Sequence, residues 1–230
     1  MSRYVFRPLL RAAAFATVFA AFAGPAAAAS LSSLVGGGSL STADVTVNGF
    51  SYNDVGGGFG DVAVPASTVD VSISSTANTV RLLFTFDPLI DLTAPDDVFE
   101  INGGFTVNVG SSRLLTEVAY DFVSFDRDGD AFVEVGSSTF GGLVIFSNGG
   151  EQHTDSEAIA PPVGSLAFLW DAQGEVFSAG GAADLGAFGV TFTLDSDFTP
   201  TGAVPVPAAL PLLASGVLAF GFAGWRRRRG

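Results

Sequence analysis

The sequence predicts an all-β fold, an antiparallel β-sandwich or jelly-roll-like single domain that spans residues 30–194. Three observations predict it. Short runs of alternating apolar and polar residues recur along this stretch, glycine, proline, asparagine, aspartate and serine separate the runs, and no long segment has the apolar spacing and caps of a helix. About ten strands at short intervals are typical of antiparallel sandwiches.

Eight runs are assigned as strands, because in each of them every second residue is apolar or the whole run is. The runs are 69–73, 80–86, 105–109, 118–125, 132–135, 143–146, 166–170 and 188–194. The chain has 22 phenylalanines, which we expect to fill the space between the sheets. Trp170 ends an apolar run, so we expect it in the core rather than on a sugar-binding surface.

The chain contains no cysteine. The fold therefore depends on apolar burial and backbone pairing rather than on disulfides. The roughly 170 residues between the two terminal segments are enough for one core and marginal for two, which predicts one domain.

Residues 1–29 have the three parts of a secretory signal peptide. The basic residues are Arg3, Arg7 and Arg11. An apolar segment follows at 12–23, and the alanine-rich exit predicts cleavage by signal peptidase after Ala28 or Ala29. The alternative is a membrane-anchoring helix, for which the apolar segment is short. No paired arginines precede it, which favours the general secretory route.

The charge of the chain is distributed unevenly. All ten basic residues are arginines, three in the signal segment and four near the C-terminus, and all 23 acidic residues lie between Asp44 and Asp197. The body retains three arginines against 23 carboxylates, a net charge of −20. Such a body repels nucleic acids and anionic membrane surfaces and attracts cations, so no nucleic-acid partner is expected.

The C-terminal segment 204–230 follows a linker at 195–203 and has three parts. An uncharged stretch at 208–225 would measure about 27 Å as a helix, enough to cross a bilayer core. Proline disfavours helix at the residue before it, so the motif that precedes this span stays extended. Arginines remain on the cytoplasmic side of a membrane, which places the body outside. The motif is Val204, Pro205, Val206, Pro207 and Ala208, and the terminal cluster is Arg226, Arg227, Arg228 and Arg229.

This order resembles the PEP-CTERM sorting signal, in its Val-Pro-Leu-Pro-Ala variant, of Gram-negative bacteria that make exopolysaccharide. Val206 stands where that variant has leucine, and the glutamate of the founding Pro-Glu-Pro form is absent. The resemblance implies that an exosortase recognises the tail and processes the protein near the prolines. The inner membrane then holds the protein only transiently, before it reaches the cell surface or extracellular matrix. The alternative is a permanent C-terminal anchor.

Asp126, Asp128 and Asp130 alternate in the stretch FDRDGDAF. On one curved loop their charges would repel unless a cation joined them, and hard oxygen ligands suit calcium. The stretch resembles the opening of an EF-hand loop but departs from it at Ala131 and Ser137, so no EF-hand is expected. The alternative is a hairpin turn at Asp128-Gly129 with solvated aspartates.

Enzyme motifs are scarce in the body. His153 is the only histidine and is expected in a loop, and no G-x-S-x-G elbow occurs. The absence of lysine and cysteine excludes Schiff-base and thiol chemistry. The sequence therefore predicts a non-enzymatic surface or extracellular-matrix protein associated with exopolysaccharide and biofilm. The alternative is a calcium-dependent carbohydrate-binding module that uses the 126–130 loop.

Overall fold

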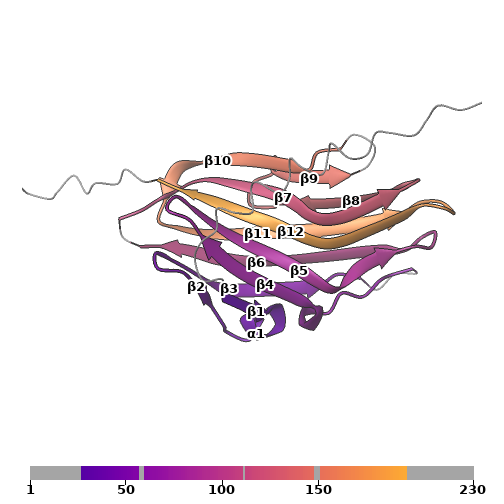
Figure 1. Cartoon of the computed structure of the whole chain (residues 1–230), viewed down its shortest axis with the longest axis horizontal. Coiled ribbons are helices and arrows are strands. Elements are labelled where there is room, and N and C mark those ends of the chain that lie inside the picture. Colours follow the sequence, from indigo (N-terminus) through magenta and orange to yellow (C-terminus); the bar gives the residue numbers. More distant parts are fainter. Residues whose placement is uncertain (1–26, 57–59, 111, 148–150, 196–230) are drawn as a thin grey trace, which may run out of the picture. The chain divides into compact units, whose positions relative to one another are not determined.

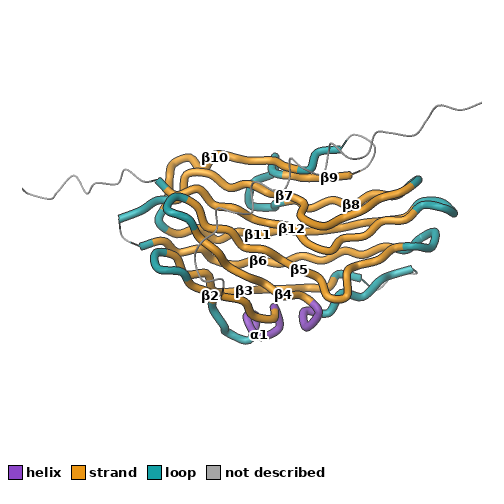
Figure 2. Tube along the Cα trace, viewed as in Figure 1, coloured by secondary structure: helices purple, strands orange, loops and turns teal. Residues whose placement is uncertain are grey.

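The computed structural model describes residues 27–56, 60–110, 112–147 and 151–195. Most of this part of the chain is strand (Figure 2). The helical turns are α1 (Leu31–Val35) and η2 (Ala66–Thr68). The strands are β1 (Ala27–Ser30), β2 (Leu40–Ser41), β3 (Val45–Asp54), β4 (Val69–Ser75), β5 (Thr79–Leu92), β6 (Val98–Val109), β7 (Leu115–Asp128), β8 (Ala131–Gly136), β9 (Val144–Ser147), β10 (Thr154–Val163), β11 (Ser165–Val176) and β12 (Ala182–Leu194).

The strands form two antiparallel sheets of six strands each (Figure 1). The first sheet has the order β1-β4-β5-β12-β7-β10, and the second has the order β2-β3-β6-β11-β8-β9. The predicted all-β class is confirmed, and each of the eight assigned runs lies in a strand, Leu143 excepted. Within the described ranges no helix is long and apolar enough to cross a membrane. The span predicted at 208–225 and the sorting motif lie outside these ranges.

Aromatic side chains pack the two sheets against each other. Phe84 of β5 stacks on Phe188 of β12 with ring centroids 4.9 Å apart. Trp170, on β11 of the other sheet, lies 5.2 Å from Phe84 and 5.4 Å from Phe188, centroid to centroid. All three side chains are buried. The expectation that phenylalanines and Trp170 fill the core is confirmed.

Some of the strand structure was not predicted. β10 contains Pro161 and Pro162, which interrupt a strand pattern, yet it lies at the edge of the first sheet, where an unpaired N–H position tolerates proline. β6 continues through Gly103, where a Cβ atom would come 2.6 Å from Cζ2 of Trp170. Gly103 therefore makes room for the central tryptophan.

The first described strand includes the predicted signal-cleavage residues. Ala28 and Ala29 belong to β1 and lie opposite Ser72 and Val71 of β4. β-Structure thus begins three residues before the predicted domain start. Cleavage after either alanine stays a prediction, and it would remove half or more of β1.

The predicted hairpin at Asp128-Gly129 is wrong. A turn does lie there, and Gly129 has a φ of +64°, but β7 and β8 belong to different sheets. β7 pairs with β12 and β10, whereas β8 pairs with β11 and β9, and no ladder joins β7 to β8. The chain therefore crosses from one sheet to the other at this turn.

Candidate functional site

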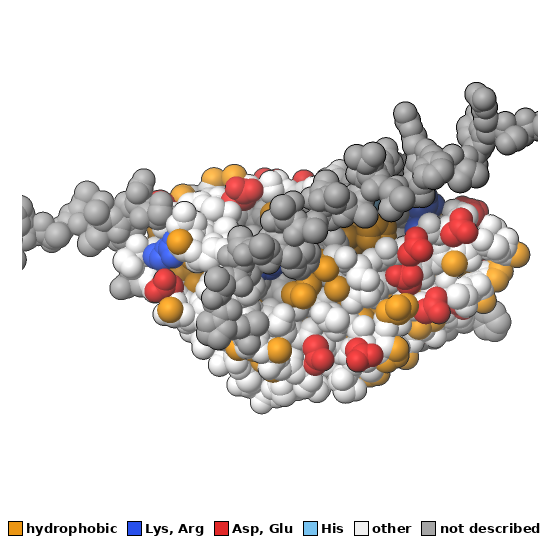
Figure 3. Space-filling view, viewed as in Figure 1, with side chains coloured by type: hydrophobic (Ala, Val, Ile, Leu, Met, Phe, Trp, Pro, Cys, Tyr) orange, Lys and Arg blue, Asp and Glu red, His pale blue; other side chains and the backbone are white. Residues whose placement is uncertain are grey.

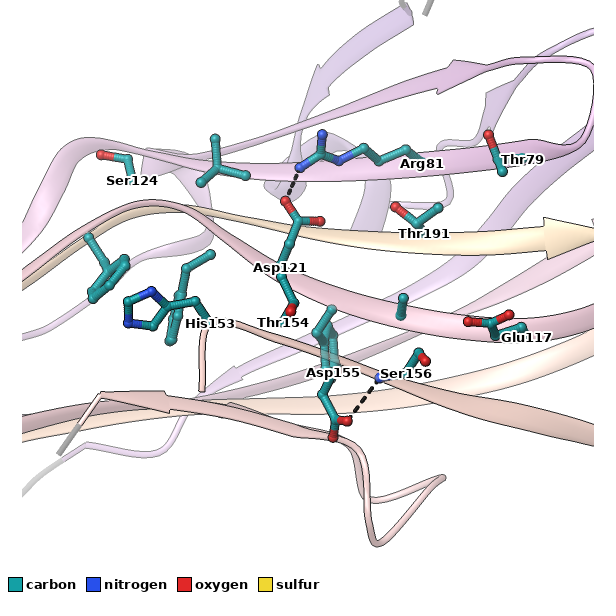
Figure 4. Close-up of a pocket in the computed structure, with 15 residues that line it drawn as sticks. Thr79, Arg81, Glu117, Asp121, Ser124, His153, Thr154, Asp155, Ser156 and Thr191 are labelled. Atoms are coloured by element: carbon teal, nitrogen blue, oxygen red, sulfur yellow. Dashed lines mark hydrogen bonds and ion pairs between the residues drawn. The ribbon is translucent and has the colours of Figure 1, made fainter. Parts of the chain in front are cut away.

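A groove of about 1100 Å³ lies on the outer face of the first sheet, and we call it the outer groove (Figure 4). Its polar side chains come from four adjacent strands and from the residue that precedes β10. Ser124 and His153 lie at one end of the groove, Thr79, Thr191 and Glu117 at the other, with Arg81 and Asp121 between them. The polar and charged lining residues are Thr79, Arg81, Glu117, Asp121, Ser124, His153, Thr154, Asp155, Ser156 and Thr191.

Strand register brings these residues together. Side chains alternate between the two faces of a strand, so the burial of Val118 and Tyr120 in the core turns Glu117, Ala119 and Asp121 of β7 outward. Residues opposite one another then form rows across the sheet. One row is Arg81, Thr191, Ala119 and Ser156, and the next contains Gly189, Asp121 and Thr154.

An ion pair occupies the middle of the groove. Arg81 Nη2 of β5 donates to Asp121 Oδ2 of β7 across the intervening strand β12 (Figure 4). The Arg81 side chain is 8% exposed and that of Asp121 is 31% exposed. Gly189 of β12 lies beneath the pair, and a Cβ atom there would come 2.6 Å from both Arg81 Nη2 and Asp121 Oδ1. A side chain at position 189 would therefore displace the ends of Arg81 and Asp121 from this geometry.

The electrostatics of Asp121 combine two opposing effects. Burial raises the pKa of its carboxyl group above the ordinary value, and the positive charge of Arg81 acts against that rise. Because burial is the larger effect, the ionised carboxylate depends on Arg81 more than an exposed aspartate would.

His153 closes one end of the groove. It precedes β10, as the predicted loop residue should, and its Nε2 lies 3.2 Å from Glu151 Oε2. Its ring is 4.7 Å from that of Phe125 in an edge-on arrangement. The imidazole thus adds a ring and a polar edge to this end of the groove.

Asp126, Asp128 and Asp130 are all exposed, and the first two belong to β7. Asp126 Oδ1 accepts from the backbone N–H of Arg127 and Asp128 Oδ1 from that of Gly129, each at 2.8 Å. Among the residues that the structure describes, no group of three or more histidine, aspartate or glutamate side chains is arranged to hold a metal ion. Calcium binding by these three residues stays a prediction.

Asp126 also shares a row with two other carboxylates of the same sheet. Asp184 of β12 lies opposite Asp91 of β5 on one side and opposite Asp126 of β7 on the other. The pKa of Asp184 is raised, first by burial and then by the negative charges of Asp126 and Asp91. Figure 3 shows acidic side chains grouped on the face that it displays. The row concentrates negative charge within one sheet.

Replacing Asp184 by asparagine is expected to stabilise the protein by about 0.5 kcal/mol at pH 7, because like charges directly opposite each other destabilise a sheet. A raised folded-state pKa means that the ionised carboxylate opposes folding above that pKa. The gain in stability of the variant is therefore complete at neutral pH. It disappears as the pH falls through the raised pKa of folded Asp184 towards the pKa that this group has in the unfolded chain. Urea unfolding at several pH values measures it.

The matched control is Asp70→Asn on β4. Asp70 is exposed and lies opposite Ser30 and Thr85, so its replacement removes one charge without relieving a like-charge row. An equal gain from both variants would assign the effect to net charge rather than to the row.

Comparison with protein-family models finds no match, and comparison with curated proteins finds none either.

The outer groove was missed by sequence reasoning. Arg81 and Asp121 are 40 positions apart, and Gly189 lies on a third strand. One signal was present: Arg81 is one of three arginines in a lysine-free body, and its alternating run directs it outward. Nothing local indicated the carboxylate that it meets.

Proposed function

We propose that this protein is an exported, non-enzymatic component of the bacterial cell surface or extracellular matrix that is sorted through its C-terminal segment. The observation that carries the proposal is the order of the segment 204–230: a Val-Pro-Val-Pro-Ala motif, an uncharged span and four arginines. This order resembles the PEP-CTERM signal of Gram-negative bacteria. Signal peptidase and an exosortase are the partners during export, and exopolysaccharide is the partner outside.

The described body fits that role as an exported unit that needs no disulfide. We infer a jelly-roll arrangement, because β5-β12-β7-β10 in one sheet faces β6-β11-β8-β9 in the other and the chain crosses repeatedly between the sheets. Three of the four edge strands are short, and β10 carries prolines and acidic residues. Such edges resist uncontrolled pairing between copies.

The experiment is mass spectrometry of the protein recovered from the surface and medium of the producing bacterium. The expected form begins at Ala29 or Ser30, ends near Pro205 or Pro207, and lacks residues 208–230. A variant with Arg226–Arg229 replaced by alanine should keep the C-terminal segment.

Two outcomes oppose the proposal. An exported body that keeps its C-terminal segment in the inner membrane supports the permanent anchor instead. An intact chain that is stable in the cytosol, with both terminal segments present, contradicts export altogether.

Calcium-dependent carbohydrate binding at Asp126, Asp128 and Asp130 is the second candidate function. A ligand that binds only the folded state raises the melting temperature, so calcium at millimolar concentration should raise it and Asp128→Asn should abolish the rise. Magnesium at the same concentration controls for ionic strength. An unchanged melting temperature removes calcium from the account.

A further inference from the structure

We infer that the outer groove binds a neutral, hydroxyl-rich glycan chain. The inference rests on the proposed function, since a matrix protein meets polysaccharide, and it adds the site and the ligand class. The groove measures about 1100 Å³. That is at or above the upper end of the roughly 300–1,000 Å³ range of small-molecule pockets, so it suits an oligomer better than a single sugar.

The hydrogen-bonding groups of the outer groove match sugar hydroxyls. A sugar hydroxyl both donates and accepts, as do the side chains of Thr191 and Ser156, which lie in one cross-strand row. Thr154 lies in the next row, beside Asp121. The Arg81 guanidinium supplies donors only and the Asp121 carboxylate supplies acceptors only. Donors and acceptors thus alternate over a short distance.

The central ion pair is better explained by binding than by stability. An ion pair that is mostly withdrawn from water contributes little net stability, because desolvation offsets the attraction. The pair also lies directly over Gly189 of a central strand, and glycine weakens a strand interior. The ion pair does hold a donor, the Arg81 guanidinium, and an acceptor, the Asp121 carboxylate, in one fixed geometry. A ligand that binds both groups therefore loses little free energy in ordering them.

Charge selects a neutral ligand. The groove contains the carboxylates of Glu117 and Asp121 against the guanidinium of Arg81, in a body with a net charge of −20. A polyanion would be repelled by both. Small apolar surface at Ala119 lies between the polar groups and offers contact for the C–H face of a sugar ring.

The test is isothermal titration calorimetry on the full chain in mild detergent. The probes are the neutral hexasaccharides cellohexaose, maltohexaose and mannohexaose, with hexagalacturonate as the anionic probe. At least one neutral probe is expected to bind and hexagalacturonate is not. Asp121→Asn and Thr154→Val should each weaken neutral binding about tenfold or more, equivalent to ~1.4 kcal/mol. Asp70→Asn, on the same sheet but outside the groove, should leave it unchanged.

The two groove variants keep the test decisive. Thr154 is exposed on an edge strand, so Thr154→Val should fold even if Asp121→Asn does not. The inference is overturned if no neutral probe binds at millimolar concentration, if hexagalacturonate binds better, or if Thr154→Val binds as tightly as the wild-type chain. Export is measured separately by mass spectrometry. A protein that is exported and trimmed but binds none of the probes therefore overturns glycan binding by the outer groove and leaves the proposed function standing.

Discussion

Trp170→Ala is expected to lower the free energy of unfolding by about 4 kcal/mol, within the range for deleting a large buried aromatic side chain. Trp170 contacts Phe84 and Phe188 of the opposite sheet and lies over Gly103 of its own. Its removal leaves a cavity in the middle of the core, which these neighbours fill only partly. Urea unfolding followed by circular dichroism measures the loss.

The matched control is the adjacent Leu169→Ala. Leu169 is 51% exposed on the opposite face of β11. The stability lost in Leu169→Ala should therefore be a small fraction of that lost in Trp170→Ala. The aromatic cluster around Trp170 also includes Tyr52, whose ring centroid lies 6.4 Å from that of Trp170. A loss below about 1 kcal/mol for Trp170→Ala would show that this cluster does not hold the sheets together.

Arg81→Met is expected to destabilise the protein by about 2 kcal/mol at pH 7. Removing one partner of a buried pair costs about 3–5 kcal/mol, and the partial exposure of Asp121 reduces that figure. Without the guanidinium, burial alone acts on the carboxyl group and its pKa rises further. The loss of stability is complete above the raised pKa of Asp121. It declines as the pH falls towards the pKa of this group in the unfolded chain, because protonation removes the buried charge.

The double variant Arg81→Met/Asp121→Leu serves as the control, since it removes both charges and fills the site with apolar atoms. It should recover most of the stability lost in Arg81→Met and show a weaker dependence on pH. Thermal unfolding between pH 4 and pH 8 separates the two variants. Equal losses at every pH would exclude the stranded carboxylate as the cause.

Local pattern predicted the strands well because alternation and burial are read from adjacent residues. The runs at 80–86 and 118–125 lie wholly inside β5 and β7. β10 was missed, because its prolines are compatible with a strand only at a sheet edge, and edge position is a property of the fold. The error at Asp128-Gly129 has a similar origin. A dipeptide predicts a turn, whereas long-range pairing decides which sheet the next strand joins.

The site was less predictable than the fold. A site could be predicted at the aspartates of 126–130 because they lie close together in the sequence. The outer groove, in contrast, takes its polar groups from separate strands. The sequence shows Arg81 as one of three arginines in the body, but it was not predicted to belong to a site. The space that Gly189 leaves for the Arg81–Asp121 ion pair could be recognised only from the structure.

Gly189 also contributes to the alignment of β12 with its neighbours. Opposite faces of a strand alternate, so sliding β12 by a single residue would place Val190 or Phe188 beneath the guanidinium and the carboxylate and turn the glycine towards the core. Either bulky side chain would separate the two charges and leave a void inside. Gly189 thus acts together with the buried Phe188, Val190 and Phe192 in favouring one alignment of the central strand over the adjacent ones.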